Sequence, residues 1–313
     1  MKTIGISFLD SYLKNSECNN KRFIKELRKI YYSSQLNLVL GSGVSKAAGL
    51  PLWPQLVKEL YIDVIVNNFM EEEPDWEKLD LKTDELILQA RYIKKGYGDL
   101  TKFVEAIRKN LYTREVDVDN DLMQAIGRLC VPTRASHLKS IITYNFDDLL
   151  EKKLETLKVE YKGIYDSNIC FNKSDLPIYH VHGFLPQDSK EVTTKNLIFS
   201  DDDYNKQASG KIFSWSNVIQ LTSFKDSCNL FIGASFNDSN LRRILEIVKN
   251  NFQGVVNYAI QKRSFDSKKQ DEKNRKFCLI NDYLKENVLD ELGIKIIWVD
   301  DFSEIPEIIE SIK

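Results

Sequence analysis

The sequence predicts an α/β fold, a doubly wound and mostly parallel Rossmann-like sheet with an inserted helical subdomain. Three observations support this prediction. Short apolar runs alternate with helical patterns along most of the chain, small or polar residues follow several of these runs, and one long stretch shows helical patterns alone. Strands that alternate with helices are typical of a parallel sheet. A chain of 313 residues is long enough for about two domains or one large domain.

The apolar runs are short enough to be buried strands, and turn or helix signals bound each of them. The first run leads directly into a glycine, and the others follow a long helical stretch. The predicted strands cover residues 36–40, 141–144, 178–181, 230–233, 255–260 and 294–299.

Helix starts are marked by residues that favour N-terminal positions. Asn19 and Asn20 are predicted to cap the first helix, and Pro54 suits the first turn of the second. Thr83 and Asp99 are predicted to cap two more helices, each followed by apolar residues at helical spacing.

Helical patterns without a strand predict a helical insertion over residues 54–130, so that residues 1–53 and 131–313 form the sheet domain. Charged residues dominate the stretch 266–276, which we expect to be a solvated loop and helix face. Further helices are predicted over residues 147–157, 239–248, 270–289 and 305–312.

Charge and cysteine content exclude several classes of protein. The 44 Lys and Arg against 46 Asp and Glu leave a net charge of −2, so no overall basic field is present and we expect no direct nucleic acid binding. The five cysteines lie at least 40 residues apart, which is typical of reduced thiols and leaves no local zinc ribbon. Without a signal peptide or a run of about 20 apolar residues, we expect a cytoplasmic protein with no membrane segment.

The first predicted strand is followed by a turn of small residues that contains Gly41, Ser42, Gly43, Ser45 and Gly49. Open α/β sheets bind ligands at the carboxyl ends of their strands, and backbone N–H groups in such a turn are able to approach a pyrophosphate closely. The dinucleotide fingerprint and the P-loop spacing are both absent. A tight strand-to-helix turn without a ligand is the alternative interpretation.

Polar residues also follow two later strands. Asn145 and Asp147 come after the second strand, and Gly233, Ser235 and Asp238 follow another. The alternative interpretation is that these polar side chains only cap the helices that come next. Because the carboxyl ends of parallel strands gather on one edge of a sheet, we expect these residues to meet the glycine turn there.

Two of the three histidines, His180 and His182, flank the end of one strand. Side chains alternate along a strand, so the two rings face the same side unless the strand has already ended. A metal pair lacks a third ligand at suitable spacing, and we expect no metal. A general acid or base is the favoured interpretation of His182.

The order of these motifs resembles the sirtuin family, because Gly-Ser-Gly-Val-Ser, Ala-Gly-Leu-Pro, Thr-Tyr-Asn-Phe-Asp, His-Gly and Gly-Ala-Ser follow one another along the chain. Trp53, residues 147–151 and 197–200, and the pair Asp203-Tyr204 are more narrowly similar to bacterial sirtuin-like domains of antiphage defence systems, including Thoeris effectors. The deacylase sirtuins carry close cysteine pairs for zinc and an Asp-Phe-Arg sequence, and this chain has neither.

The resemblance implies that the sheet domain binds NAD as its substrate and cleaves the bond between nicotinamide and ribose. It further implies that Asn145 holds the ribose hydroxyls or the attacking water, that Asp147 binds the nicotinamide end, and that His182 is the general base. The binding residues that it implies are Gly41, Ser42, Gly43 and Ser45 for the pyrophosphate, Gly233 and Ser235 for the adenosine half, and in addition Gly49 and Asp238.

The function implied by the resemblance is that of an NAD glycohydrolase which depletes NAD during antiphage defence. Since an unregulated enzyme of this kind would harm its host, we expect control through a homo-oligomer or an activating protein partner, because the sequence shows no obvious second sensor domain. Two alternatives stay open. One is an NAD-dependent protein deacylase or ADP-ribosyltransferase, and the other is a module that senses NAD or ADP-ribose without chemistry.

Overall fold

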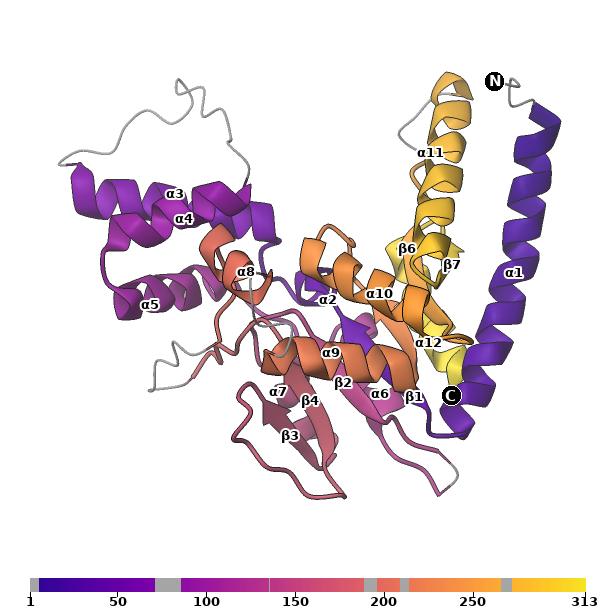
Figure 1. Ribbon diagram of the computed structural model, residues 1–313, viewed down its shortest axis with the longest axis horizontal. Coiled ribbons are helices and arrows are strands. Elements are labelled where there is room, and N and C mark those ends of the chain that lie inside the picture. Colours follow the sequence, from indigo (N-terminus) through magenta and orange to yellow (C-terminus); the bar gives the residue numbers. More distant parts are fainter. Residues whose placement is uncertain (1–5, 71–85, 135, 189–195, 209–213, 266–271) are drawn as a thin grey trace.

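The computed structural model describes residues 6–70, 86–134, 136–188, 196–208, 214–265 and 272–313. Seven strands form one sheet in the order β3-β4-β2-β1-β5-β6-β7, and all neighbouring pairs are parallel (Figure 1). The predicted parallel α/β fold is therefore confirmed. The strands are β1 (Leu36–Leu40), β2 (Ser140–Thr143), β3 (Tyr161–Ile164), β4 (Leu176–His180), β5 (Cys228–Ile232), β6 (Asn257–Lys262) and β7 (Ile294–Val299).

Helices cover both faces of the sheet, as a doubly wound fold requires. Leu38 and Leu40 of β1 point into one core cluster, and Val39 between them points into the other. All three side chains are buried, so this part of β1 is apolar on both faces of the sheet. The first face carries α1 (Ile6–Tyr32), α6 (Asp121–Cys130), α7 (Leu149–Thr156) and α12 (Ile305–Ile312), and the second carries α9 (Trp215–Asp226), α10 (Ser239–Asn251) and α11 (Glu272–Glu291).

Between β1 and β2 the described residues form helices joined by loops, and none of them forms a strand. Pro54 lies in the first turn of α3, and the Asp99 side chain caps α5 by accepting a hydrogen bond from Lys102 N at 2.9 Å, both as predicted. The division into a helical subdomain and a sheet domain stays a prediction. The described helices between β1 and α6 are α2 (Ser42–Ala47), α3 (Trp53–Phe69), α4 (Leu86–Tyr97) and α5 (Leu100–Leu111), of which the last three lie together on one side of the molecule (Figure 1).

The predicted start of the first helix is wrong, because α1 already includes Ile6 and runs through Asn19 and Asn20. The Asn20 amide instead donates to Trp298 O at 2.7 Å, and its oxygen accepts from Trp298 N at 3.0 Å. The Asn20 side chain, which local preference favours as a helix cap, therefore bonds to β7 instead. Thr83 and part of the stretch 266–276 lie outside the described residues.

A row of buried polar side chains crosses the amino-terminal half of the sheet. Ser140 Oγ donates to Asn37 Oδ1 at 2.9 Å, Asn37 donates to Asn229 Oδ1 at 3.0 Å, and Asn229 donates to Asn257 Oδ1 at 2.8 Å. The row links β2, β1, β5 and β6. A shift of strand register by one residue would leave these buried groups unpaired. The row of hydrogen bonds therefore stabilises the observed register relative to the shifted ones.

The loops that follow β1 and β5 touch through their backbones at the point where the chain reverses its direction across the sheet. A Cβ on Gly41 would lie 2.5 Å from Gly233 O, and a Cβ on Gly43 would lie 2.7 Å from Gly233 Cα. Gly233 itself has a φ of +69°. No larger residue fits at these positions, and the contact is what brings the two loops together.

We expect Gly233→Ala to lower the free energy of unfolding by about 1–3 kcal/mol more than Gly98→Ala. The two glycines have nearly the same φ, +69° and +67°, but an added Cβ meets Val44 N at 2.7 Å in the first case and nothing within 4 Å in the second. Urea unfolding of both variants separates backbone strain from crowding. Equal losses of stability in the two variants would contradict the close backbone contact between the loops after β1 and β5.

Candidate active site

A cavity of about 590 Å³ opens at the carboxyl ends of β1, β2, β4 and β5. Its volume is typical of small-molecule sites, and it lies where the strand order reverses, as ligand sites of open α/β sheets do. Residues from all four predicted loops meet in its wall. Those among the predicted site residues are Gly41, Ser42, Ser45, Asn145, Asp147, His182, Ser235 and Asp238.

The remaining wall of the cavity is largely apolar, and the segment around the start of α3 forms part of it. Leu52, Trp53, Pro54 and Leu56 contribute to it, and the Trp53 ring packs on Phe199 with the ring centroids 4.4 Å apart. The cavity therefore has a polar floor at the strand ends and an apolar side.

Asn145 follows β2 and reaches across to the loop after β1. Its Nδ2 donates to Gly41 O at 3.1 Å, and its backbone N–H donates to Thr143 Oγ1 at 3.1 Å. The residue is only 9% exposed although it lines the cavity. These contacts fix one edge of the amide and leave Oδ1 as the atom with which Asn145 is able to accept a hydrogen bond from a ligand.

Asp147 lies beside Asn145, buried in the same wall. Its Oδ2 accepts a hydrogen bond from Ser45 Oγ at 2.6 Å, and its Oδ1 accepts one from Leu149 N at 3.2 Å. Burial nevertheless dominates and raises the pKa of the Asp147 carboxyl to about 6, since the hydrogen bonds offset the cost of desolvation only in part. Asp147 thus holds Ser45 through a hydrogen bond. Because its pKa is near neutral pH, a charged ligand nearby is able to shift it between the neutral and the ionised form.

The two histidines near the end of β4 have different surroundings. β4 ends at His180, and the predicted common orientation of the pair does not occur. The His180 ring lies 2.6 Å from Glu151 Oε1 in the core below the site, whereas His182 lines the cavity. Burial lowers the pKa of His182, so the ring is neutral and able to accept a proton at neutral pH.

Three of the predicted binding glycines support the fold instead of forming the wall. Gly43 and Gly233 are in backbone contact behind the cavity, and the N–H groups of Gly41 and Gly43 donate to Ile232 O at 2.9 Å and to Gly233 O at 3.0 Å. A pyrophosphate would have to open these bonds to use the two N–H groups. Gly49 ends α2 with a φ of +102° and packs on the backbone of the loop before α6.

The loop after β5 contributes exposed and buried groups to the same wall. Ser235 is exposed there, and Asp238 caps α10, with Oδ1 accepting from Leu241 N at 2.7 Å. Phe236 between them has a φ of +60°, in the left-handed region that a bulky residue seldom occupies. Such strain is typical of functional loops.

Two tyrosines in the wall were not predicted as site residues. The rings of Tyr144 and Tyr204 meet the His182 ring edge to face, with centroids 4.8 Å and 5.8 Å away. Tyr204 belongs to α8 (Asp201–Ala208), and no local pattern in the sequence indicates that this helix returns to the site. For Tyr144, its place at the end of the predicted strand and beside Asn145 was the available signal.

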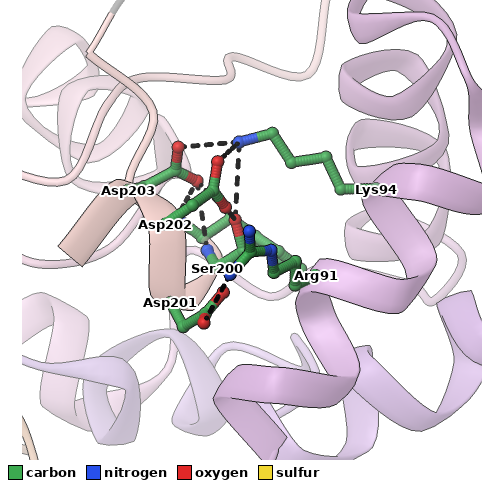
Figure 2. A network of polar contacts seen from close by, with 7 residues as sticks. Arg91, Lys94, Ser200, Asp201, Asp202 and Asp203 are labelled. Atoms are coloured by element: carbon green, nitrogen blue, oxygen red, sulfur yellow. Dashed lines mark hydrogen bonds and ion pairs between the residues drawn. The ribbon is translucent and has the colours of Figure 1, made fainter. Parts of the chain in front are cut away.

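An ion-pair network anchors the start of α8 to α4 (Figure 2). Lys94 Nζ lies 2.7 Å from Asp203 Oδ1 and 3.2 Å from Asp202 Oδ2, and Arg91 Nη1 lies 3.1 Å from Asp201 Oδ2. The helical segment between β1 and β2 therefore holds the helix that carries Tyr204.

The described residues hold no cluster of three or more His, Cys, Asp or Glu side chains arranged to bind a metal ion. Within the same part of the chain, every helix is too short or too polar to cross a membrane.

The fold and the cavity define a Rossmann-like α/β protein with a cavity of the size of small-molecule sites at its topological switch point. A model of the SIR2-like domain family matches residues 139–295, which is half of the chain. The chain belongs to this family, and the resemblance that the motifs predict is confirmed.

Curated relatives with the name NAD(+) hydrolase ThsA align over most of this chain. The protein of Enterococcus faecium is 23% identical over 306 residues, which cover 94% of this chain and 58% of that protein. Those of Acinetobacter baumannii (strain 532279) and Bacillus cereus (strain MSX-D12) are each 23% identical over 302 residues, covering 93% of this chain and 55% and 56% of the relatives. This chain thus spans little more than half the length of the relatives it matches. A solved structure of a Sir2 enzyme aligns with a TM-score of 0.42 at 13% identity, over 92% of this chain and 97% of that chain.

We expect Asp147→Asn to become more stable relative to the unsubstituted protein as the pH rises from about 4 to about 6. The unfolded carboxyl loses its proton near pH 4 and the folded one near pH 6, so ionisation of Asp147 costs stability across this window, and Asn removes that cost. The difference between the free energies of unfolding should grow by up to about 3 kcal/mol. Urea unfolding at several pH values measures it, and a difference that does not vary with pH would contradict the raised pKa.

Proposed function

We propose that the protein is an NAD glycohydrolase, which cleaves the bond between nicotinamide and ribose to give nicotinamide and ADP-ribose. The observation that carries this proposal is that Asn145 and His182, which come from different strand ends, line one cavity together with Ser42, Ser45 and Ser235. An amide, a neutral imidazole and hydroxyl groups are what is needed to orient a ribose and to activate water beside it.

The reaction requires no general acid to protonate the leaving group. The nicotinamide of NAD is a pyridinium cation, so it leaves as a neutral base and needs no proton. The sugar develops charge like that of an oxocarbenium ion, as in other glycoside cleavages. Asn145 would hold the ribose hydroxyls or the attacking water, and His182 would accept the proton that the nucleophile loses.

The charges of the wall suit the cationic end of the substrate. The lining residues that the structure describes include Asp147 and Asp238 and neither Lys nor Arg. A pyridinium beside Asp147 would favour the ionised carboxylate and be attracted to it. The pyrophosphate would be bound by hydroxyl groups such as those of Ser42 and Ser235, which are exposed in the wall.

The names of the relatives support the same chemistry, since they are NAD(+) hydrolases that align over most of this chain. We further propose that the protein acts in antiphage defence by depleting NAD, and that self-assembly or an activating protein partner controls it. Full NAD turnover by isolated monomers without any trigger would contradict this control.

We expect Asn145→Ala and His182→Ala each to lower the rate of nicotinamide release by at least about 100-fold. Both residues would act directly on the ribose or on its nucleophile. His137→Ala is the matched control, because His137 is exposed and makes its side-chain contact with Ser34 outside the cavity. The measurement is chromatography with mass spectrometry of NAD incubated with each folded variant.

The same assay decides between the functions that the sequence leaves open. Nicotinamide and ADP-ribose formed from NAD alone support the hydrolase. Nicotinamide release that requires an acetyl-lysine peptide would indicate a deacylase, and NAD that binds but stays intact would indicate a sensor. Either variant with near wild-type NAD consumption would contradict the assigned roles.

A further inference from the structure

The His182 ring packs against two tyrosine rings and lies near one carboxylate. Its Nε2 is 3.3 Å from Asp238 Oδ2, and the aromatic neighbours are Tyr144 from the loop after β2 and Tyr204 from α8. Nε2 is buried and makes no hydrogen bond within the described structure, and the Asp238 carboxylate is the acidic group in ion-pair range of it.

Asp238 does more than cap a helix. Capping α10 uses Oδ1, which accepts from Leu241 N at 2.7 Å. The second oxygen, Oδ2, accepts from Tyr204 Oη at 3.1 Å and is the atom that faces His182. A cap requires one oxygen, so the placement of Oδ2 between a phenol and an imidazole calls for a separate explanation.

We infer that Asp238, held in place by Tyr204, is the positioning residue of His182, and that it fixes the imidazole with its proton on Nε2. The basic lone pair is then on Nδ1. This inference rests on the proposed function for its consequence in catalysis, whereas the orientation itself is a property of the free protein. A carboxylate that sets the tautomer of a histidine base in this way is a known arrangement in hydrolases.

The proton balance of the step follows from this tautomer. As the bond between ribose C1′ and the nicotinamide nitrogen breaks, nicotinamide leaves with the electron pair. Water forms the new bond to C1′, and one of its protons passes to Nδ1 of His182. The imidazolium that results donates from Nε2 to the Asp238 carboxylate, and the proton is later lost to solvent.

Tyr204 has its own support, which extends the arrangement beyond the cavity. Lys94 on α4 pairs with Asp202 and Asp203 at the start of α8, one helical turn or less before Tyr204 (Figure 2). The pKa of Tyr204 is raised by burial and by Asp238, so its hydroxyl keeps the proton that it donates.

The charged and titratable groups that face His182 set the pH dependence. They are Asp238 at the start of α10, Tyr204 on α8 and Tyr144 after β2, and the pKa of each tyrosine is raised so that both stay neutral. Burial lowers the pKa of His182 while the Asp238 charge raises it. Loss of that charge should therefore move the acid limb of the rate profile to lower pH.

The test is Asp238→Asn, because Asn is as good an N-cap as Asp and keeps α10 capped. We expect kcat for NAD hydrolysis to fall by about 100-fold or more, with KM changed less than about threefold and the acid limb moved to lower pH. Tyr204→Phe should lower kcat by about threefold to tenfold. Asp99→Asn is the matched control, since Asp99 caps α5 in the same way outside this cavity, and its kcat should stay unchanged.

A second readout does not depend on activity. In protein labelled with ¹⁵N-histidine, NMR reports the tautomer of His182, whose signals are identified by their loss in His182→Ala. We expect the proton on Nε2 in the unsubstituted protein and a mixed population in Asp238→Asn. An unchanged tautomer, or a kcat retained in Asp238→Asn, would overturn the inference, whereas the expected tautomers without any NAD hydrolysis would overturn only the proposed function.

Discussion

The contact between the backbones of Gly43 and Gly233 is the constraint on which the rest of the site depends. It holds the loops after β1 and β5 so close that a Cβ on either glycine meets main-chain atoms at 2.7 Å. Gly41 O is thereby placed where Asn145 donates to it from the loop after β2. One steric requirement at the switch point of the sheet thus orients side chains from three strand ends.

Burial then sets the charges of the site in opposite directions. It raises the pKa of Asp147 and lowers that of His182, so that each group is moved toward its neutral form. The pyridinium end of the proposed substrate would change this balance in favour of an ionised carboxylate, while the neutral imidazole is already suited to accept a proton. The ion pairs between α4 and α8 extend the arrangement to the helical segment that follows β1 (Figure 2).

Local patterns predicted the features that depend on neighbouring residues. The runs at Leu36–Leu40 and Ile294–Val299 are strands with the predicted bounds, and Asp99 caps a helix as expected. Asp238 also caps a helix, which was the alternative interpretation of that residue. Asn20 is not the cap that local preference indicated, because its side chain bonds to Trp298 on β7. Such contacts are made between residues far apart in sequence and leave no periodic signal.

For the candidate site, too, the sequence predicted the local motifs but not the contacts between residues far apart in the chain. Strand-end loops with small or polar residues indicated Asn145 and His182, but the pairing of His182 with Asp238 and Tyr204 requires the folded chain. The most direct test of the central claim is a crystal structure of the Asn145→Ala variant grown with NAD. The account predicts the nicotinamide ribose between position 145 and His182, with the pyrophosphate near Ser42 and Ser235. NAD bound elsewhere, with its ribose out of reach of His182, would contradict it.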